Sequence, residues 1–558
     1  MKALKEKIAS AGFLPAMAVI CAALLRLWAI NFGLPHTETR PDESTVIIIA
    51  FQLISAKLHP VTLIYPTLFT YILAAIFSVF ALFKGAGGHI YDFLTSYYIA
   101  SPSFFFITAR LLGAACGIAN VIPCYLMGRE LKNEKAAICS AFFMAFCYLN
   151  VRDSHFGVLD VPMTLFITWA AFFALRALRT GALRDYVLCG VFTGLATGTK
   201  YAGIIMIAQM FCVHALSLRA ENKITAKTLF TDRRISLFCV SLLGVFFLTT
   251  PYLFLDINTT MEGYKYHNQL HNFMGGSNWL HHLEFSLLEG LGAPMFIAAA
   301  AGIIILAIKD IRKLTAGFLF AVLYFIVISR TGSGYVRYAV PLLPFACVAA
   351  GYLTAVAAGH RNAGRLWLVI PVVIIGQSAA RCADFDLLLS QTDTRVLAAR
   401  YMEDIAGPYT IFQSASPYTD LQLRFDTDYY AYREQEALSR NALVRARLYE
   451  VKKETAQSAT GAPKPLYYNP DGSFSDVSGA PAGPPDYIAV MQEPFNFGIA
   501  DNFARLLDEK YEKQAFFEGF DETRSGNTYD TEDAFFVPFS GFYGITRPGP
   551  NVYVFKRK

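Results

Sequence analysis

The run DVPMTLFITWAAFFALRAL, residues 160–178, is nearly all apolar and long enough to cross a bilayer as one helix. A spanning helix needs about 20 mostly apolar residues. Of the 558 residues, 54% are hydrophobic and 16% are charged, whereas a typical soluble domain has about 25% charged residues. Similar apolar runs occupy roughly 12–31, 66–84, 104–128, 135–150, 184–199, 200–217, 236–254, 289–308, 314–330, 338–358 and 365–381. The sequence therefore predicts a multi-pass α-helical membrane protein and excludes a single water-soluble globule, a disordered chain and a collagen-like chain.

Clusters of Lys and Arg between these runs predict the orientation, because cytoplasmic loops are enriched in them. If the run 66–84 spans the membrane, the first cluster lies inside and all later clusters lie outside. If that run lies in the membrane interface, every cluster lies inside. The second solution predicts about eleven spans, a cytoplasmic N-terminus in the plasma (inner) membrane, and interfacial helices at about Pro41 to Leu58 and after Tyr65-Pro66. The clusters are Lys2/Lys5/Lys7, Arg129/Lys132/Lys135, Arg176/Arg179/Arg184, Arg219/Lys223/Lys227/Arg233/Arg234, Lys309/Arg312/Lys313 and Arg361/Arg365.

Residues 382–558 have the composition of a soluble domain and alternate between helical and strand patterns. They predict a soluble extracytoplasmic α/β domain that follows a transmembrane domain at residues 1–381. No nucleophile elbow, P-loop or Gly-rich dinucleotide turn occurs in it, so accessory recognition or structural support is expected. The predicted elements are helices at Thr394 to Ile405 and Ala504 to Ala515, strands at 409–412, 487–490 and 552–555, and a loop from Ser458 to Pro485.

Gly190, Gly194 and Gly198 form a GxxxGxxxG ladder within one apolar run. Small residues at this spacing let the backbones of two membrane helices approach closely. The ladder predicts a tight helix–helix contact.

The first polar group near the predicted outer face is Arg40-Pro41-Asp42-Glu43. Pro at the first helical position with acids in the first turn is a common helix start. A carboxylate fixed at a helix N-terminus is also well placed to take a proton from an attacking hydroxyl. The two interpretations are compatible, and both stay open.

The second polar group is Arg152-Asp153-Ser154-His155, followed by Asp160. Asp160 precedes Pro162, so one interpretation is a plain N-cap. The other places Asp160 opposite Asp42 across a cavity, where it would orient an acceptor or help to bind a cation.

Isolated cations form the third group, since the predicted topology brings Lys200, Arg330 and Arg337 close to the outer face. Burying a charge at that depth is costly, so each is expected to have a partner. A phosphate of a lipid-linked substrate is one candidate, and a structural carboxylate is the other.

The histidines of an outer loop form the fourth group: His267, His271, His281 and His282. His267 and His271 have the i, i+4 spacing of metal ligands, which suits a metal only if that stretch is helical. No HExxH motif accompanies them. Ordinary loop histidines or substrate contacts are the alternatives.

Taken together, these segments resemble the polyprenyl-phosphate-sugar-dependent glycosyltransferases of the GT-C fold, the group of the protein O-mannosyltransferases and the enzyme that adds aminoarabinose to lipid A. The order and spacing of the motifs carry the resemblance over nearly the whole membrane part. The family's usual double proline before the second interfacial helix is replaced here by Tyr65-Pro66-Thr67. The motifs are Gly33-Leu34-Pro35 through Arg40-Pro41-Asp42-Glu43, Tyr65-Pro66-Thr67-Leu68, Arg110-Leu111-Leu112, Gly128-Arg129-Glu130-Leu131, Arg152 through Pro162, Gly194 through Tyr201, Arg337-Tyr338 through Pro344, and Arg547-Pro548-Gly549-Pro550.

The resemblance implies a role for each candidate. Asp42 is the expected catalytic base, with Glu43 as its neighbour or substitute, and Asp160 is a second acid of the site. Lys200, Arg337 and Tyr338 are expected to bind the donor phosphate. A divalent cation could assist, held by Asp42 and Asp160. The remaining site candidates are Arg40, Tyr65, Arg152, His155, His267 and His271.

The expected activity is transfer of a hexose or pentose from a polyprenyl-phosphate-linked donor to an acceptor hydroxyl at the outer face, with inversion. The acceptor is a protein, a lipid or a polysaccharide, and membrane lipids surround the chain. The net charge of +5 is too small for a nucleic-acid partner. The alternatives are a transporter or flippase for a lipid-linked or small polar substrate, and a non-catalytic scaffold for polysaccharide assembly.

Overall fold

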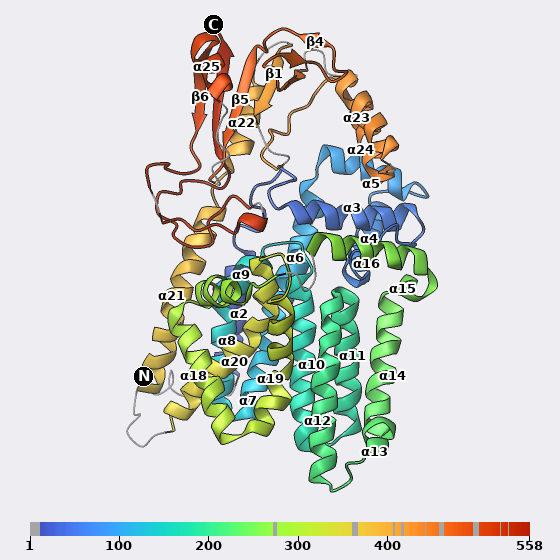
Figure 1. Ribbon diagram of the computed structural model, residues 1–558, viewed down its shortest axis with the longest axis vertical. Helices are drawn as coiled ribbons and strands as arrows, with labels where there is room; N and C mark the ends of the chain where they lie inside the picture. The colour runs from blue at the N-terminus through green and yellow to red at the C-terminus, as the bar shows by residue number, and fades with distance from the viewer. Residues whose placement is uncertain are drawn as a thin grey trace. The chain divides into compact units, whose positions relative to one another are not determined.

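The computed structural model describes residues 12–271, 276–359, 366–405, 408–414, 418–440, 442–456, 462–494, 501–524, 526–533 and 535–558 (Figure 1). Its contacts divide the chain into two compact units. The first unit comprises Met1–Ile30, Leu58–Leu73 and Thr108–Phe385. The second comprises Asn31–Lys57, Ala74–Ile107 and Asp386–Lys558. The predicted division between residues 381 and 382 stays a prediction.

The first unit is helical. Its elements are α2 (Phe13–Leu27), α6 (Ser103–Ala119, which begins in the second unit), α7 (Val121–Leu131), α8 (Glu134–Ala145), α9 (Tyr148–Ser154), α10 (Asp160–Thr180), α11 (Leu183–Thr199), η1 (Tyr201–Ile205), α12 (Met206–Ala220), α13 (Ala226–Thr231), α14 (Arg233–Thr249), α15 (Tyr252–Leu255), α16 (Ile257–His271), α17 (Trp279–His281), the π-helix η2 (His282–Glu289), α18 (Ala293–Lys309), α19 (Ile311–Ile328), η3 (Val336–Leu342), α20 (Leu343–Ala357) and α21 (Leu366–Leu389, which ends in the second unit).

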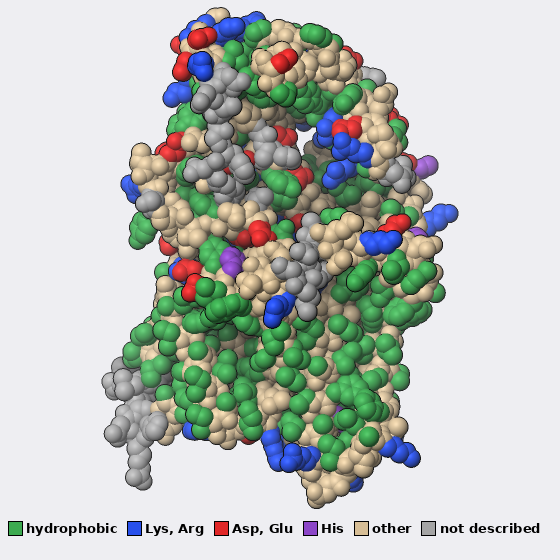
Figure 2. All heavy atoms as spheres, viewed as in Figure 1, with side chains coloured by type: hydrophobic (Ala, Val, Ile, Leu, Met, Phe, Trp, Pro, Cys, Tyr) green, Lys and Arg blue, Asp and Glu red, His purple; other side chains and the backbone are tan. Residues whose placement is uncertain are grey.

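Five helical stretches among the described residues are long and apolar enough to cross a membrane, or up to seven if each of two bent helix pairs is one span. The run predicted to lie in the interface forms α4 (Leu68–Phe83), which is shorter, at 16 residues. Figure 2 shows hydrophobic side chains covering the outside of the first unit's helices. The predicted multi-pass helical membrane protein is confirmed, whereas the number of about eleven spans stays a prediction.

The glycine ladder lies where α11 packs against α14, and Figure 1 shows these two helices side by side. A Cβ atom added at Gly194 would meet the backbone oxygen of Leu242 and Cβ of Val245, each at 2.8 Å. Gly190 and Gly198 face Phe238 and Thr249 in the same way. The predicted close helix packing is confirmed.

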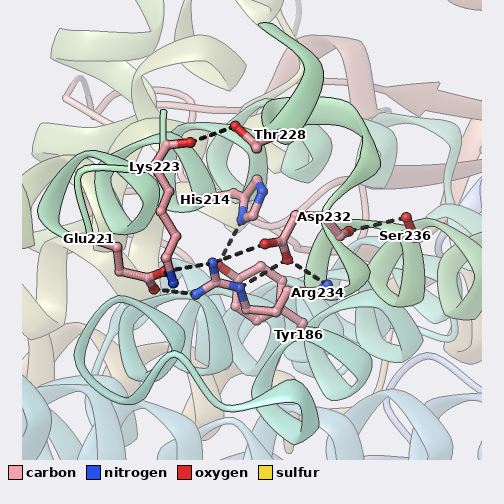
Figure 3. Close-up of polar contacts among 8 residues, drawn as sticks. All are labelled: Tyr186, His214, Glu221, Lys223, Thr228, Asp232, Arg234 and Ser236. Atoms are coloured by element: carbon pink, nitrogen blue, oxygen red, sulfur yellow. Dashed lines mark hydrogen bonds and ion pairs between the residues drawn. The ribbon is translucent and has the colours of Figure 1, made fainter. Parts of the chain in front are cut away.

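A cluster of polar side chains connects α12, the segment that follows it and the start of α14 (Figure 3). Arg234 pairs with Glu221, Nη1 to Oε1 at 2.6 Å, and with Asp232, Nε to Oδ1 at 3.0 Å. The Tyr186 hydroxyl lies 3.1 Å from Nδ1 of His214. Because its guanidinium pairs with both Glu221 and Asp232, Arg234 connects the end of α12 to the start of α14.

The second unit contains a mixed α/β part. Its helices are α3 (Pro41–Ser55), the end of α4, α5 (Ile90–Ala100), α22 (Thr394–Glu403), α23 (Thr427–Ser439), α24 (Leu443–Ala456), α25 (Asp501–Lys510) and η4 (Thr531–Asp533). Its seven-stranded sheet has the order β4-β3-β2-β1-β5-β7-β6. The strands are β1 (Thr410–Ser414), β2 (Lys464–Tyr468), β3 (Phe474–Ser475), β4 (Pro481–Ala482), β5 (Tyr487–Gln492), β6 (Tyr511–Phe517) and β7 (Asn551–Arg557).

The sheet confirms the predicted α/β class and corrects two of its elements. β1 pairs in parallel with β2 and β5, and the other pairs are antiparallel. The helix predicted at Ala504 to Ala515 ends at Lys510, because the residues that follow pair with β7 as an edge strand. The predicted loop at Ser458 to Pro485 contains β2, β3 and β4. In both places, pairing with distant strands outweighs the local pattern.

Gly194→Leu should disrupt the α11–α14 contact. Overpacking of this kind costs about 1–3 kcal/mol, so the thermal unfolding midpoint in detergent should fall. Gly244→Leu is the matched control, since Gly244 lies on α14 with open space around the added atoms. Equal midpoints for the two variants would contradict the packing role.

Candidate active site

An ion pair between Asp160 and Lys200 lies at the centre of the first unit's candidate site. Asp160 begins α10 and Lys200 follows the last residue of α11, so two neighbouring helices position the two charges. Lys200 Nζ lies 2.6 Å from Asp160 Oδ1. The Asp160 side chain is 4% exposed and that of Lys200 is 21% exposed. The Asp160 carboxylate is therefore buried, while the Lys200 side chain is partly exposed.

Tyrosine side chains surround this pair. Lys200 Nζ lies 5.1 Å from the ring centroid of Tyr338, on η3, and the Tyr338 ring lies 5.3 Å from that of Tyr335. Tyr65 and Asp160 lie within electrostatic reach of the Tyr338 hydroxyl. Tyr324, on α19, lies within reach of Asp160 and Tyr338. The sequence motifs include neither Tyr324 nor Tyr335, because an aromatic residue in an apolar run carries no signal of its own.

Arg337 adds a second cation to the site. Its guanidinium stacks over Tyr335, with the carbon 4.4 Å from the ring centroid, and the side chain is buried. Lys200 and Arg337 thus place two cations near the Tyr338 hydroxyl, together with the Asp160 carboxylate. An ammonium has three N–H donors, of which Asp160 takes one. Such an arrangement can bind a phosphate.

Arg152 and His155 are buried in protein contacts. Arg152 Nη1 lies 3.0 Å from Asp153 Oδ2, and its guanidinium carbon lies 5.3 Å from the Phe156 ring centroid. The two ring nitrogens of His155 lie 2.9 Å from the backbone oxygens of Val151 and Trp28. These contacts connect α9 to the end of α2. A role of either residue in binding stays a prediction.

The acidic motif of the first predicted outer loop lies in the second unit. Arg40 has the extended backbone of an N-cap, Pro41 begins α3, and Asp42 and Glu43 occupy its first turn, as the sequence predicts. The Asp42 side chain is 32% exposed, whereas Glu43 is fully buried. Of the two acids, Asp42 is therefore the one accessible to solvent.

Arg40 connects this motif to Asp533, the last residue of η4. Its Nη1 lies 3.9 Å from Asp42 Oδ2, and its Nη2 lies 2.9 Å from Asp533 Oδ1. Nη1 also donates to the backbone oxygen of Asp533 at 3.1 Å. The Arg40 and Asp533 side chains are almost completely buried. No sequence pattern points to Asp533, since a pairing across 493 positions leaves no local signal.

The structure thus brings Asp160, Lys200, Tyr338 and Arg337 together in the first unit, and Arg40, Asp42 and Glu43 together in the second. The predicted placement of Asp42 opposite Asp160 stays a prediction, as does a shared divalent cation.

The histidine pair is helical in its backbone, since His267 and His271 belong to α16. Their side chains lie outside the described residues. Within the part of the chain that the structure describes, no group of three His, Cys, Asp or Glu side chains is placed to hold a metal ion.

Residues 95–246 match the family described as dolichyl-phosphate-mannose-protein mannosyltransferase. The predicted resemblance to glycosyltransferases of this group is confirmed. Asp160 and Lys200 both lie in the matched segment. The match supports a lipid-linked sugar transferase and does not favour a transporter. A comparison with curated proteins found no match.

Solved structures similar to the chain include the oligosaccharyltransferase AglB from Archaeoglobus fulgidus, crystallised with an inhibitory peptide and a dolichol-phosphate. It is 13% identical, with 99% of this chain and 89% of that one covered and a TM-score of 0.47. ArnT from Cupriavidus metallidurans, bound to undecaprenyl phosphate, is 11% identical with 98% of each chain covered and a TM-score of 0.48. The Pmt1–Pmt2 protein O-mannosyltransferase complex of S. cerevisiae, bound to its sugar donor, is 20% identical over 44% of this chain and 34% of that one, with a TM-score of 0.33.

Asp533→Asn should destabilise the second unit. Removing one partner of a buried ion pair costs up to about 3–5 kcal/mol, and the longer 3.9 Å contact of Arg40 with Asp42 offsets only part of that loss. Chemical or thermal unfolding of the purified protein measures this loss. The matched control is Asp521→Asn, because Asp521 pairs with the exposed Arg524 at 3.1 Å and a surface pair contributes about 1 kcal/mol or less. Similar losses in the two variants would refute a structural role for the Arg40–Asp533 pair.

Proposed function

We propose that this chain transfers a hexose or pentose from a polyprenyl-phosphate-linked donor to an acceptor hydroxyl at the outer face of the membrane. The observation that carries the proposal is the Asp160–Lys200 pair, which lies inside the segment that matches the mannosyltransferase family. Tyr338 lies beside Lys200, and Arg337 stacks on Tyr335. The acceptor is a protein, a lipid or a polysaccharide.

The donor's phosphate is the leaving group in this mechanism. As the bond to the anomeric carbon breaks, negative charge grows on the phosphate oxygens, and fixed cations stabilise that charge. Lys200 and Arg337 supply the cations. Tyr338, whose ring lies under Lys200, supplies a hydroxyl donor beside them. Asp160 holds the Lys200 ammonium in place through the 2.6 Å contact.

Asp42 is the proposed general base. The first turn of a helix favours a negatively charged side chain, which suits a base that must be ionised to accept a proton. Asp42 takes the proton of the acceptor hydroxyl, and the hydroxyl oxygen attacks the anomeric carbon from the side opposite the phosphate. A single displacement inverts the configuration at that carbon. Glu43 is buried beside Asp42 and supports the same helix start.

Asp42→Asn should abolish sugar transfer, because an amide cannot accept the acceptor's proton. The assay uses purified protein, a polyprenyl-phosphate sugar and an extract of the membrane's own acceptors, with unfolding curves to show that the variant folds. The control is Asp92→Asn, since Asp92 is half-exposed and pairs with Arg447 at 3.2 Å. Near-normal transfer by Asp42→Asn would exclude Asp42 as the base.

The proposed orientation has a separate test. Asp471→Cys places a thiol at an exposed position of the C-terminal part, and an impermeant maleimide should label it in intact cells. Lys223→Cys, in the loop after α12, should be labelled only after the membrane is permeabilised. The unsubstituted chain gives the background from its ten native cysteines. Protection of the thiol at position 471 in intact cells would reverse the predicted topology.

A further inference from the structure

Three charged side chains of the second unit face one another: Glu38, Asp420 and Lys452. Glu38 precedes α3, Asp420 follows β1, and Lys452 lies on α24. Each lies within electrostatic reach of the other two. None of them belongs to the proposed machinery of proton transfer or phosphate binding.

These groups are enclosed by protein and yet keep contact with solvent. Burial raises the pKa of Glu38 to about 7 and that of Asp420 to about 6, and it lowers the pKa of Lys452. Taken as whole residues, all three are only partly buried, so they lie close to the protein surface. Figure 2 shows the molecule hollowed beside α23 and α24, with Lys and Arg side chains at the edge. We call this feature the polar recess.

Hydrogen bonds connect the two segments that carry Glu38 and Asp420. His36 Nε2 lies 2.9 Å from the backbone oxygen of Asp420. The Thr37 backbone N–H donates to Gln422 Oε1 at 3.0 Å, and Gln422 Nε2 donates to Thr37 Oγ1 at 2.8 Å. These bonds hold the segment before α3 against the segment after β1, so the charged side chains are set in place by backbone contacts.

The charged groups keep unused hydrogen-bonding capacity. Glu38 accepts one bond, from Ser44 Oγ at 3.1 Å. Across the described ranges, neither the Asp420 carboxylate nor the Lys452 ammonium forms an ion pair. Lys452 Nζ instead lies 5.9 Å from the Tyr430 ring centroid and 6.0 Å from that of Tyr449. Buried polar groups normally have a hydrogen-bond partner, so a ligand that forms hydrogen bonds would fit beside these groups.

Two tyrosine hydroxyls lie near the carboxylates. Tyr98 lies within reach of Glu38, and Tyr429 lies within reach of Asp420. Carboxylates accept bonds from hydroxyl groups, an ammonium donates to hydroxyl or ring oxygens, and aromatic rings pack against apolar C–H faces. A sugar ring presents all three of these features. An anion would meet two carboxylates here, and a cation would meet Lys452 with Arg433 and Arg445 close by.

We propose that the polar recess binds a sugar unit of the acceptor, so that the acceptor is a glycan or a glycan-bearing lipid. The assignment as an acceptor rests on the proposed function. The recess adjoins the proposed base through the start of α3: Ser44 bonds Glu38 and also donates to the backbone oxygen of Pro41 at 2.8 Å. An acceptor sugar held by Glu38 therefore lies next to the helix turn that carries Asp42.

Saturation-transfer NMR on the full chain in nanodiscs, without donor, tests the proposal. The probes are mannotriose, chitotriose and galactotriose. We expect saturation of at least one probe, with affinity reduced about tenfold in Asp420→Asn and in Lys452→Met, since each variant loses a charged hydrogen-bonding partner of the sugar. Lys453→Met, whose side chain pairs with Glu434 at 2.5 Å, and Asp428→Asn, which is exposed, should leave the affinity unchanged.

Three results would overturn the proposal: no saturation of any probe, equal affinity in the recess and control variants, or displacement of the bound probe by inorganic phosphate. The Asp42→Asn variant separates this proposal from the proposed function, because it should bind the probe normally while failing in transfer. If binding fails and Asp42→Asn still abolishes transfer, the acceptor class is wrong and the transferase stands. If binding holds and Asp42→Asn still transfers sugar, the recess stands as a glycan site and Asp42 is not the base.

Discussion

The structure depends on one constraint: a charge placed among apolar helices must find its compensation there. Arg26 is fully buried in α2, in the middle of an apolar run. It donates to the backbone oxygens of Met144 and Ala145 at 3.0 and 2.9 Å and to Asn150 Oδ1 at 2.8 Å. Those acceptors lie where α8 gives way to α9, so the break between the two helices supplies the carbonyls that the guanidinium needs.

The same constraint explains how polar residues are tolerated in α10. The hydroxyls of Thr164 and Thr168 donate to backbone oxygens one turn earlier, both at 2.7 Å. Asp160, at the start of that helix, is compensated by a side chain of another helix. Thus the threonine hydroxyls form hydrogen bonds within their own helix, whereas the Asp160 carboxylate pairs with Lys200 at the end of α11. This ion pair holds the start of α10 against the end of α11.

Much of the local structure could be predicted from the sequence. Pro41 with two following acids marks the start of α3, and the glycine ladder marks the α11–α14 contact. Each signal lies within a few residues of the feature it predicts. Pairings across the chain have no such signal. Neither Asp533 beside Arg40 nor Lys452 near Glu38 could be predicted, because tertiary folding alone brings these residues together. For the same reason, the helix predicted at Ala504 to Ala515 wrongly includes the first residues of β6.

The Arg40–Asp533 pair has a consequence for biosynthesis. Asp533 is synthesised 493 positions after Arg40. A nascent chain can insert all the helices of its first unit while Arg40 still lacks this carboxylate. The helix start that carries Asp42 therefore reaches its final electrostatic surroundings only after Asp533 has been synthesised.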